Sequence, residues 1–187
     1  MRWRIRAPLT LIAAVLTGCA APGADLPPLP PVRTGQYILG PGDTVRVITY
    51  GAKELTGKFI VGDSGDISVP LLGTVHAAGL TARQLQKKMT ASLVHTGMFV
   101  NPSVAVEVLL YRPIFILGEV KKPGEYPYQP GMTVLTAVAI AGGFTYRAVE
   151  DRFSIIRTED GGSTEGLAMR DTALEPGDTI NVFERHF

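Results

Sequence analysis

The stretch from Tyr37 to Val47 reads YILGPGDTVRV, and it marks where the folded part of the chain begins. Its centre, Gly40-Pro41-Gly42-Asp43, has the composition of a tight turn, because glycine and proline supply the backbone angles that turns need. Behind it, Thr44 to Tyr50 alternates apolar and polar residues, which predicts a β-strand with one buried face. We expect the Asp43 carboxylate to accept bonds from the backbone N–H groups that follow it.

The same turn sequence occurs again near the end of the chain. Residues 41–45, PGDTV, return as residues 176–180, PGDTI. In each copy Pro-Gly forms the turn and threonine favours the strand behind it. The residues around the two copies do not match, so the repeat indicates one way of beginning a strand used twice and not a duplicated domain.

Between the two turns lies a first group of short elements. A helix is predicted to begin after Thr81, because Gln84 completes a capping box, and to stop at Gly97. Its buried face is predicted from apolar residues that recur every four positions, namely Leu85, Met89 and Leu93. Alternation and turn signals predict strands at residues 57–61, 66–69, 72–76 and 104–110.

A second unit is expected from Arg112-Pro113 onward. Its helix is predicted to end at Gly142-Gly143. The expected elements are a helix at 133–141 and strands at 114–120, 126–128, 153–157 and 179–183. Short strands, many turns and one helix per unit predict an α+β fold, with a small β-rich domain at residues 35–111 followed by a second domain at residues 112–187.

The first residues have the pattern of a secretion signal. Arginines at positions 2, 4 and 6 precede an apolar stretch, Leu9 to Leu16, that is too short to span a bilayer. Residues 16–19, LTGC, then resemble the bacterial lipobox, in which the signal is cut before a cysteine that is acylated, for example with palmitate. We expect a signal peptide at 1–18 and lipidation of Cys19. The alternative is an ordinary signal peptide followed by a buried free cysteine.

Residues 19–34 are expected to form a lipidated, proline-rich linker. Prolines at positions 22, 27, 28, 30 and 31 predict an extended, semi-rigid spacer of about 3.1 Å per residue. Signals that retain lipoproteins in the inner membrane resemble Asp directly after the cysteine, so Ala20 favours the outer membrane. Removal of residues 1–18 takes away three arginines and no acid, which changes the formal charge from +1 to −2.

Composition excludes several classes of protein. Cys19 is the only cysteine of the 187 residues, so neither an intramolecular disulfide nor a multi-cysteine metal site can form. A formal charge of +1 lacks the basic excess of nucleic-acid-binding proteins, and we expect no nucleic-acid partner.

The residues that could carry catalysis are not arranged for it. The histidines have no second His or Cys at metal-ligand spacing, the serines lack the glycine-flanked setting of a nucleophile, and the aspartates flank a predicted turn. Gly142-Gly143 lacks the preceding strand of a nucleotide-binding loop. We therefore expect no catalytic residue, no metal, no cofactor and no enzymatic activity. The residues considered are His76, His95, His186, Ser64, Ser154, Ser163, Asp63 and Asp66.

Four stretches occur in order along the chain: the lipobox, residues 37–47, the run from Gly65 to Val104, and the run from Gly118 to Gly143. The third contains GDISVP at 65–70 and ends with NPSV. The fourth begins with GEVKKPGEY and ends with AIAGG. Together they resemble the bacterial outer-membrane polysaccharide export family, the third stretch its export domain and the fourth a soluble-ligand-binding β-grasp (SLBB) domain.

This resemblance implies a transport role without bond chemistry. Members form homo-oligomeric rings in the periplasm beneath the outer membrane, and capsular polysaccharide or exopolysaccharide passes through the opening. An inner-membrane polysaccharide co-polymerase is the implied partner, and the polymer is the substrate. The resemblance assigns no polysaccharide-contacting residue.

One family feature is missing from this sequence. Large members carry a C-terminal amphipathic helix that crosses the outer membrane, whereas the last predicted strand here is followed only by residues 184–187. A helical crossing needs about 20 residues. We therefore expect a short member held on the periplasmic face through Cys19, with a separate outer-membrane β-barrel supplying the crossing. The alternative is a monomeric periplasmic module that binds a glycan or a partner.

Overall fold

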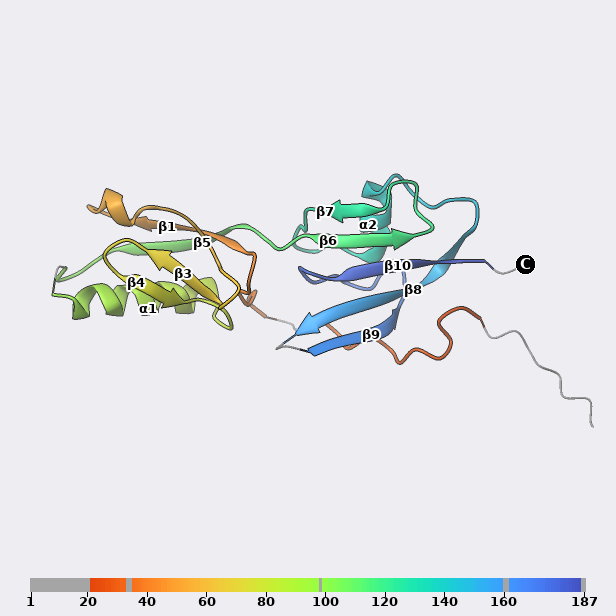
Figure 1. Cartoon of the computed structure of the whole chain (residues 1–187), viewed down its shortest axis with the longest axis horizontal. Helices are drawn as coiled ribbons and strands as arrows, with labels where there is room; N and C mark the ends of the chain where they lie inside the picture. Colours follow the sequence, from red (N-terminus) through yellow and green to blue (C-terminus); the bar gives the residue numbers. More distant parts are fainter. Residues whose placement is uncertain (1–20, 33–34, 98, 160–161, 186–187) are drawn as a thin grey trace, which may run out of the picture.

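The computed structural model of the chain describes residues 21–32, 35–97, 99–159 and 162–185. Within these ranges the chain forms two units that lie end to end and meet near residue 111 (Figure 1). Each unit has one α-helix and its own cluster of buried apolar side chains. The predicted α+β class is confirmed. The predicted signal peptide and Cys19 lie outside the described residues.

The first unit is built on a three-stranded antiparallel sheet in which β1 lies between β2 and β5. A hairpin of β3 and β4 and the helix α1 lie on one side of this sheet (Figure 1). The elements are β1 (Thr44–Thr49), the 3-10 helix η1 (Lys53–Leu55), β2 (Gly57–Ile60), β3 (Asp66–Val69), β4 (Gly73–His76), α1 (Ala82–His95) and β5 (Val104–Leu110).

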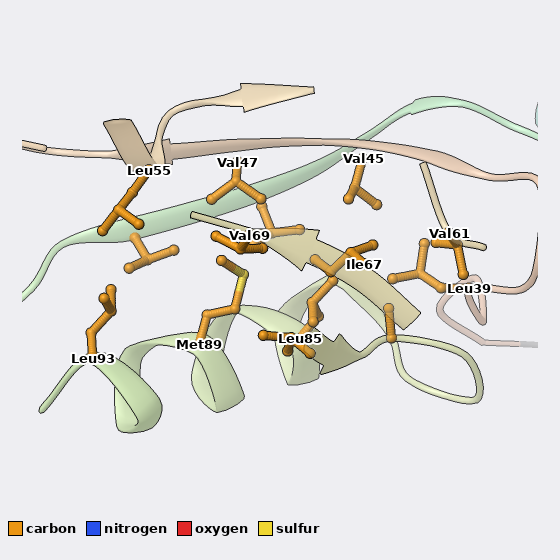
Figure 2. Packing of buried hydrophobic residues seen from close by; sticks show 14 of the residues in the cluster. Leu39, Val45, Val47, Leu55, Val61, Ile67, Val69, Leu85, Met89 and Leu93 are labelled. Atoms are coloured by element: carbon orange, nitrogen blue, oxygen red, sulfur yellow. The ribbon is translucent and has the colours of Figure 1, made fainter. Parts of the chain in front are cut away.

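The helix α1 forms as the sequence predicts. Its N-terminus has a capping box, because Thr81 Oγ1 accepts the N–H of Gln84 at 3.2 Å and the Gln84 side chain accepts the N–H of Thr81 at 2.8 Å. Leu85, Met89 and Leu93 are fully buried and point toward β1 and β3 (Figure 2). The four-residue spacing therefore identified the helix face that forms the first core.

The second unit has a five-stranded sheet in the order β7–β6–β10–β8–β9. The last strand, β10, lies in the centre, parallel to β6 and antiparallel to β8. Val134, Ala137 and Val138 of α2 are buried in the second core. The elements are β6 (Ile114–Gly118), β7 (Gly124–Tyr126), α2 (Val134–Ile140), β8 (Ala148–Glu159), β9 (Gly162–Ala168) and β10 (Thr179–Glu184).

Three strands of the second unit differ from the prediction by more than strand ends. β8 was predicted at 153–157 and runs over Ala148–Glu159. The return strand after the Lys-Pro-Gly turn is Gly124–Tyr126 and not 126–128, because Gly124 pairs directly with Ile116. β9 was not predicted at all. Its sequence, GSTEGLA, has few apolar residues, and its first four residues are exposed, so no alternating pattern marks it. Pairing with the long strand β8 determines this strand.

The proline-rich segment is docked on the second unit and is not a free spacer. We call residues 21–32 the N-terminal strap. Leu29 donates its N–H to the carbonyl of Leu167 at 3.1 Å, and Leu167 donates to the carbonyl of Pro27 at 2.7 Å. The strap thereby pairs in parallel with the edge of β9, where the absence of a side chain at Gly166 leaves room for the Leu29 backbone (Figure 1).

Candidate functional site

One buried carboxylate holds the turn that precedes β1. Asp43 has no exposed surface, and its Oδ2 accepts bonds from the N–H of Gly40 at 2.8 Å and the hydroxyl of Tyr37 at 2.7 Å. Its Oδ1 accepts the backbone N–H of Arg112 at 3.0 Å. The bonded turn N–H precedes Asp43, so the expectation that it follows was wrong. The carboxylate folds back over the turn because Gly42 adopts a left-handed conformation with φ of 91°.

Arg112 supplies the positive charge beside this carboxylate. Its Nε lies 3.6 Å from Oδ1 of Asp43, and its Nη2 donates to the Tyr37 hydroxyl at 3.2 Å. Burial raises the pKa of Tyr37, and the negative charge of Asp43 raises it further. At neutral pH the Tyr37 hydroxyl therefore stays protonated and donates a hydrogen bond to Asp43.

The second turn is built in the same way. Asp178 is 1% exposed, and its Oδ2 accepts the backbone N–H of Glu175, again three residues earlier, at 2.7 Å. Arg157 donates from Nε to Oδ1 at 2.9 Å and from Nη2 to Oδ2 at 2.8 Å. This buried, two-bonded ion pair is the geometry in which arginine and a carboxylate interact most strongly. Both Pro-Gly-Asp turns thus bind an arginine from elsewhere in the chain.

The chain between the two units lies between these turns. The N–H of Arg112 donates to the first turn, and the carbonyl of Pro113 accepts the N–H of Gly177 in the second turn at 3.1 Å. Phe115 then donates to the carbonyl of Asp178 at 2.9 Å and begins the pairing of β6 with β10. We call residues 37–43, 111–113 and 175–178 the junction. Its hydrogen bonds fix how the second unit continues from the first.

A cavity of about 760 Å³ opens at the junction, and both turns line it. The rings of Tyr37 and Tyr111 meet edge to face with centroids 4.9 Å apart, and those of Tyr111 and Tyr128 do so at 5.6 Å. Burial raises the pKa of Tyr128, and the charge of Glu175 adds to this. Aromatic faces beside backbone and carboxylate groups can hold a small polar ligand without transforming it.

Three of the residues considered for catalysis meet on the surface hairpin of β3 and β4. Nδ1 of His76 lies 2.8 Å from Oδ1 of Asp66, and Ser64 donates to Oδ2 of Asp66 at 2.9 Å. The bond from His76 lowers the pKa of Asp66. Their side chains do not line the junction cavity. They bridge the two strands of the hairpin, and the arrangement has neither a nucleophile setting nor an acid–base pair around a substrate space.

The other candidates lie apart from one another. Ser154 is buried in β8, and Ser163 bonds Thr158 at 3.0 Å across the β8–β9 hairpin. Asp63 and His95 are exposed at a turn and at the end of α1, respectively. His186 lies outside the described residues. No group of three His, Cys, Asp or Glu residues that could hold a metal ion occurs in the described part of the chain.

The sequence predicted the two turns of the junction but not the residues that bind them. The repeated Pro-Gly-Asp turns were visible, but Arg112 and Arg157 were not identified as their partners. Arginine carries no local signal for a carboxylate 69 residues before it or 21 residues after it. The one usable sign was that Arg112-Pro113 stands where the second unit was expected to begin.

The described ranges contain two α-helices, α1 and α2, and neither is long and apolar enough to cross a bilayer.

Comparison with known families divides the chain at the same place. The profile of the family described as "Polysaccharide biosynthesis/export protein" matches residues 31–109. The profile described as "SLBB domain" matches residues 113–168. The junction residues Arg112 and Pro113 therefore lie at the boundary between the two matched regions.

Individual relatives agree with these matches. The exopolysaccharide production protein ExoF of Rhizobium meliloti is 36% identical over 152 residues, which cover 75% of this chain and 35% of ExoF. The EPS I polysaccharide export outer membrane protein EpsA of Ralstonia nicotianae is 28% identical over 77% of this chain and 38% of EpsA. The polysialic acid transport protein KpsD of Escherichia coli is 31% identical over 57% of this chain and 19% of KpsD.

The chain thus spans little more than a third of the length of ExoF and EpsA. Its two matched regions, in this order, correspond to the two units of the fold. The chain therefore belongs to the polysaccharide biosynthesis/export protein family, which consists of transport components and not of enzymes, and its second unit is an SLBB domain.

Proposed function

We propose that this protein is a lipid-anchored component of a bacterial outer-membrane machine that exports capsular polysaccharide or exopolysaccharide. The observation that carries the proposal is the ordered pair of an export domain and an SLBB domain. Relatives that share this region are named for the production, export or transport of polysaccharide. The secretion signal and lipobox of residues 1–19 support an anchor at Cys19 on the periplasmic face of the outer membrane.

In this proposal the protein is a passive conduit. Arg112 and Arg157 each face a buried aspartate, so these charges are compensated within the protein and do not form a charged binding surface. A conduit must release its polymer as readily as it takes it up, which weak and compensated surfaces favour. The force that moves the polymer would come from synthesis at the inner membrane, through a polysaccharide co-polymerase.

We further propose that copies of the chain assemble into a closed periplasmic ring. A ring closes only when every copy holds its neighbours at the same angle. The hydrogen-bonded junction supports this, because it fixes the two units of each copy relative to one another. A separate outer-membrane β-barrel would then provide the passage across the membrane.

Native mass spectrometry of the acylated protein in detergent tests the assembly. A closed ring predicts one dominant oligomer whose subunit number does not change with concentration. A monomer that persists at micromolar concentration would contradict the ring for the isolated chain.

Membrane fractionation tests the anchor. The wild-type protein is expected in the outer-membrane fraction, and a Cys19→Ala variant in the soluble periplasmic fraction when partner proteins are absent. A Cys19→Ala variant that stays membrane-bound in such cells would show that lipid is not what holds the protein.

The junction cavity favours a second candidate, a monomeric module that binds a glycan. Tyr111 and Tyr128 offer aromatic rings, and the cavity is large enough for a sugar ring. Titration with oligosaccharides of the secreted polymer, followed by tyrosine NMR signals, separates the candidates. Tight, saturable binding by a monomer that a Tyr128→Ala variant loses would favour the module over the conduit.

A further inference from the structure

The strap begins at one end of the second unit. Besides its pairing with β9, it receives a bond from Nη1 of Arg157 to the carbonyl of Pro30 at 3.3 Å. At its start, Gly23 lies directly on the Phe183 ring, where an added Cβ would come within 2.8 Å of that ring. Phe183 is one of the last two residues of β10, and this strand ends on the side away from the first unit (Figure 1). The strap therefore begins at this distal end and runs toward the junction.

Covalent geometry limits how far Cys19 lies from that end. Two peptide units separate Cys19 from Ala21, the first described residue, and consecutive Cα atoms are about 3.8 Å apart. The Cα of Cys19 is thus within about 8 Å of the Cα of Ala21. An acyl chain on Cys19 would bring a bilayer surface close to the distal end of the second unit, with the first unit held away from it.

Three segments form this distal end, and hydrogen bonds join them. Lys121 donates its N–H to the carbonyl of Gly143 at 3.0 Å, and Thr145 donates to the carbonyl of Glu119 at 3.1 Å. Arg185 donates to the carbonyl of Arg147 at 2.8 Å. β6 and β10 both run toward this end of the sheet (Figure 1). We call residues 119–122, residues 144–147 and the end of β10 at residues 184–185 the tip.

The tip has the chemistry of a surface that faces phospholipid headgroups. Tyr146 is 87% exposed and is followed by Arg147, and a tyrosine, with its apolar ring and polar hydroxyl, favours the membrane interface. The tip carries four basic and two acidic residues. Glu184 pairs with Arg147, and Glu119 accepts the hydroxyl of Thr145.

Two basic residues of the tip, Lys121 and Lys122, are available to a partner, because both are exposed and neither forms an ion pair with a residue of the described ranges. Arg185 is also exposed, and its Nε donates to the carbonyl of Ala148 at 2.8 Å. Basic residues held close to a bilayer surface are attracted to anionic headgroups, whereas the whole mature chain is acidic with a formal charge of −2. The tip thus carries a formal charge of +2 within a mature chain that is acidic as a whole.

We propose that the tip docks on a surface of anionic phospholipid, so that the SLBB domain sits on the membrane and the export domain points away from it. The inference rests on the proposed acylation of Cys19. The strap then holds the anchor against the second unit, so that the protein does not change its orientation freely about the attached lipid. Residues 119–122 and 144–147 form the contact surface, with Tyr146 as the side chain that reaches furthest into the headgroup layer.

Site-specific fluorescence quenching in vesicles tests this orientation. The acylated full chain is prepared as Tyr146→Cys and as Tyr50→Cys, each labelled with an environment-sensitive fluorophore. Tyr50 is a matched control, because it is 86% exposed and lies at the opposite end of the molecule, after β1. The proteins are placed in vesicles of phosphatidylethanolamine and phosphatidylglycerol that contain a nitroxide-labelled phospholipid. Quenching is expected at position 146 and not at position 50.

Charge neutralisation tests the headgroup contact. Lys121→Gln/Lys122→Gln in the Tyr146→Cys protein should abolish the quenching, as should vesicles of phosphatidylcholine alone. The control variant is Lys87→Gln/Lys88→Gln, a pair of exposed lysines on α1, which should change nothing. Quenching that survives the loss of both tip lysines and of phosphatidylglycerol would overturn the anionic contact.

The outcomes separate this inference from the proposed function. Mass spectrometry reports whether Cys19 carries acyl chains, and an unmodified thiol would overturn the anchor together with the orientation. With Cys19 acylated, equal quenching at positions 50 and 146, stronger quenching at position 50, or none at either position would overturn the docking of the tip alone and leave the export function standing.

Discussion

At residue scale, the two Pro-Gly-Asp turns show how a local motif acquires a distant partner. Asp43 and Asp178 each accept the backbone N–H of the residue three positions earlier, whereas the turn sequence led us to expect the N–H groups that follow. The remaining oxygen lone pairs accept bonds from Arg112 and Arg157. A buried carboxylate needs such a partner, because desolvation of an isolated charge is very costly.

Removing the second carboxylate should strongly destabilise the SLBB domain. Asp178→Ala leaves Arg157, which is 5% exposed, without its two-bonded partner. We expect a loss of about 3 kcal/mol in the free energy of unfolding, the lower end of what breaking a buried pair costs, because Glu175 remains 3.7 Å from Arg157. Urea unfolding followed by circular dichroism measures it.

Asp151→Ala is the matched control for this substitution. Its side chain is 67% exposed and pairs only with the adjacent Arg152. The change should stay within about 0.5 kcal/mol. Equal losses in the two variants would mean that the buried pair is not what stabilises the second turn.

Tyr37 should make the protein less stable to unfolding at alkaline pH. Its pKa is raised above the ordinary value of 10.0 by burial and by Asp43, so the folded protein keeps the proton at a pH where the unfolded chain loses it. This contribution to stability is therefore fully present below pH 10 and is lost as the pH rises above it. A Tyr37→Phe variant should show a shallower fall of the urea midpoint above pH 10, although Tyr128 still contributes. A slope equal to that of the wild type would contradict this role of Tyr37.

At element scale, an element with a strong apolar periodicity could be predicted from the sequence, and an element without one could not. α1 was predicted with its cap and buried face, because Leu85, Met89 and Leu93 repeat at helical spacing. β9 and the strap were not, since one is polar and the other is rich in proline. Their pairing depends on partners far along the chain, the long strand β8 and the edge of β9. The strap also covers that edge, which would otherwise present unpaired backbone groups.

A substitution at Gly166 should release the strap without unfolding the SLBB domain. A Cβ there would come within 2.7 Å of the Leu29 Cα, closer than two carbons can approach, so Gly166→Ala must displace the strap backbone. Hydrogen exchange by mass spectrometry should show faster exchange in peptides that contain Leu29, while α2 stays protected.

Gly57→Ala provides the control, as it is also a strand glycine. Its added Cβ would lie 3.5 Å from the Phe59 ring, an ordinary contact. Exchange of the strap should stay at the wild-type rate in this variant. If Gly166→Ala also leaves the exchange of the strap unchanged, residues 27–30 do not pair with β9 in solution.

At the scale of the whole molecule, the junction and the strap link the two units twice. The junction fixes the direct connection through Arg112 and Pro113, and the strap runs from the distal end of the SLBB domain back to the export domain. The order of the two domains could be recognised from the motifs. Their fixed relation could not, because it depends on the bonds of Arg112 and Pro113 to Asp43 and Gly177, and no sequence pattern marks these distant residues as partners.

The central claim is that the protein exports polysaccharide and does not make or trim it. The most direct test is to delete its gene in the bacterium that carries it and to determine where the polymer accumulates and how long its chains are. We predict polymer of normal chain length trapped inside the cell envelope and absent from the cell surface, and restored export with the wild-type gene but not with a Cys19→Ala gene. Continued export of chains of altered length, or complete loss of polymer synthesis with nothing trapped in the envelope, would contradict the account.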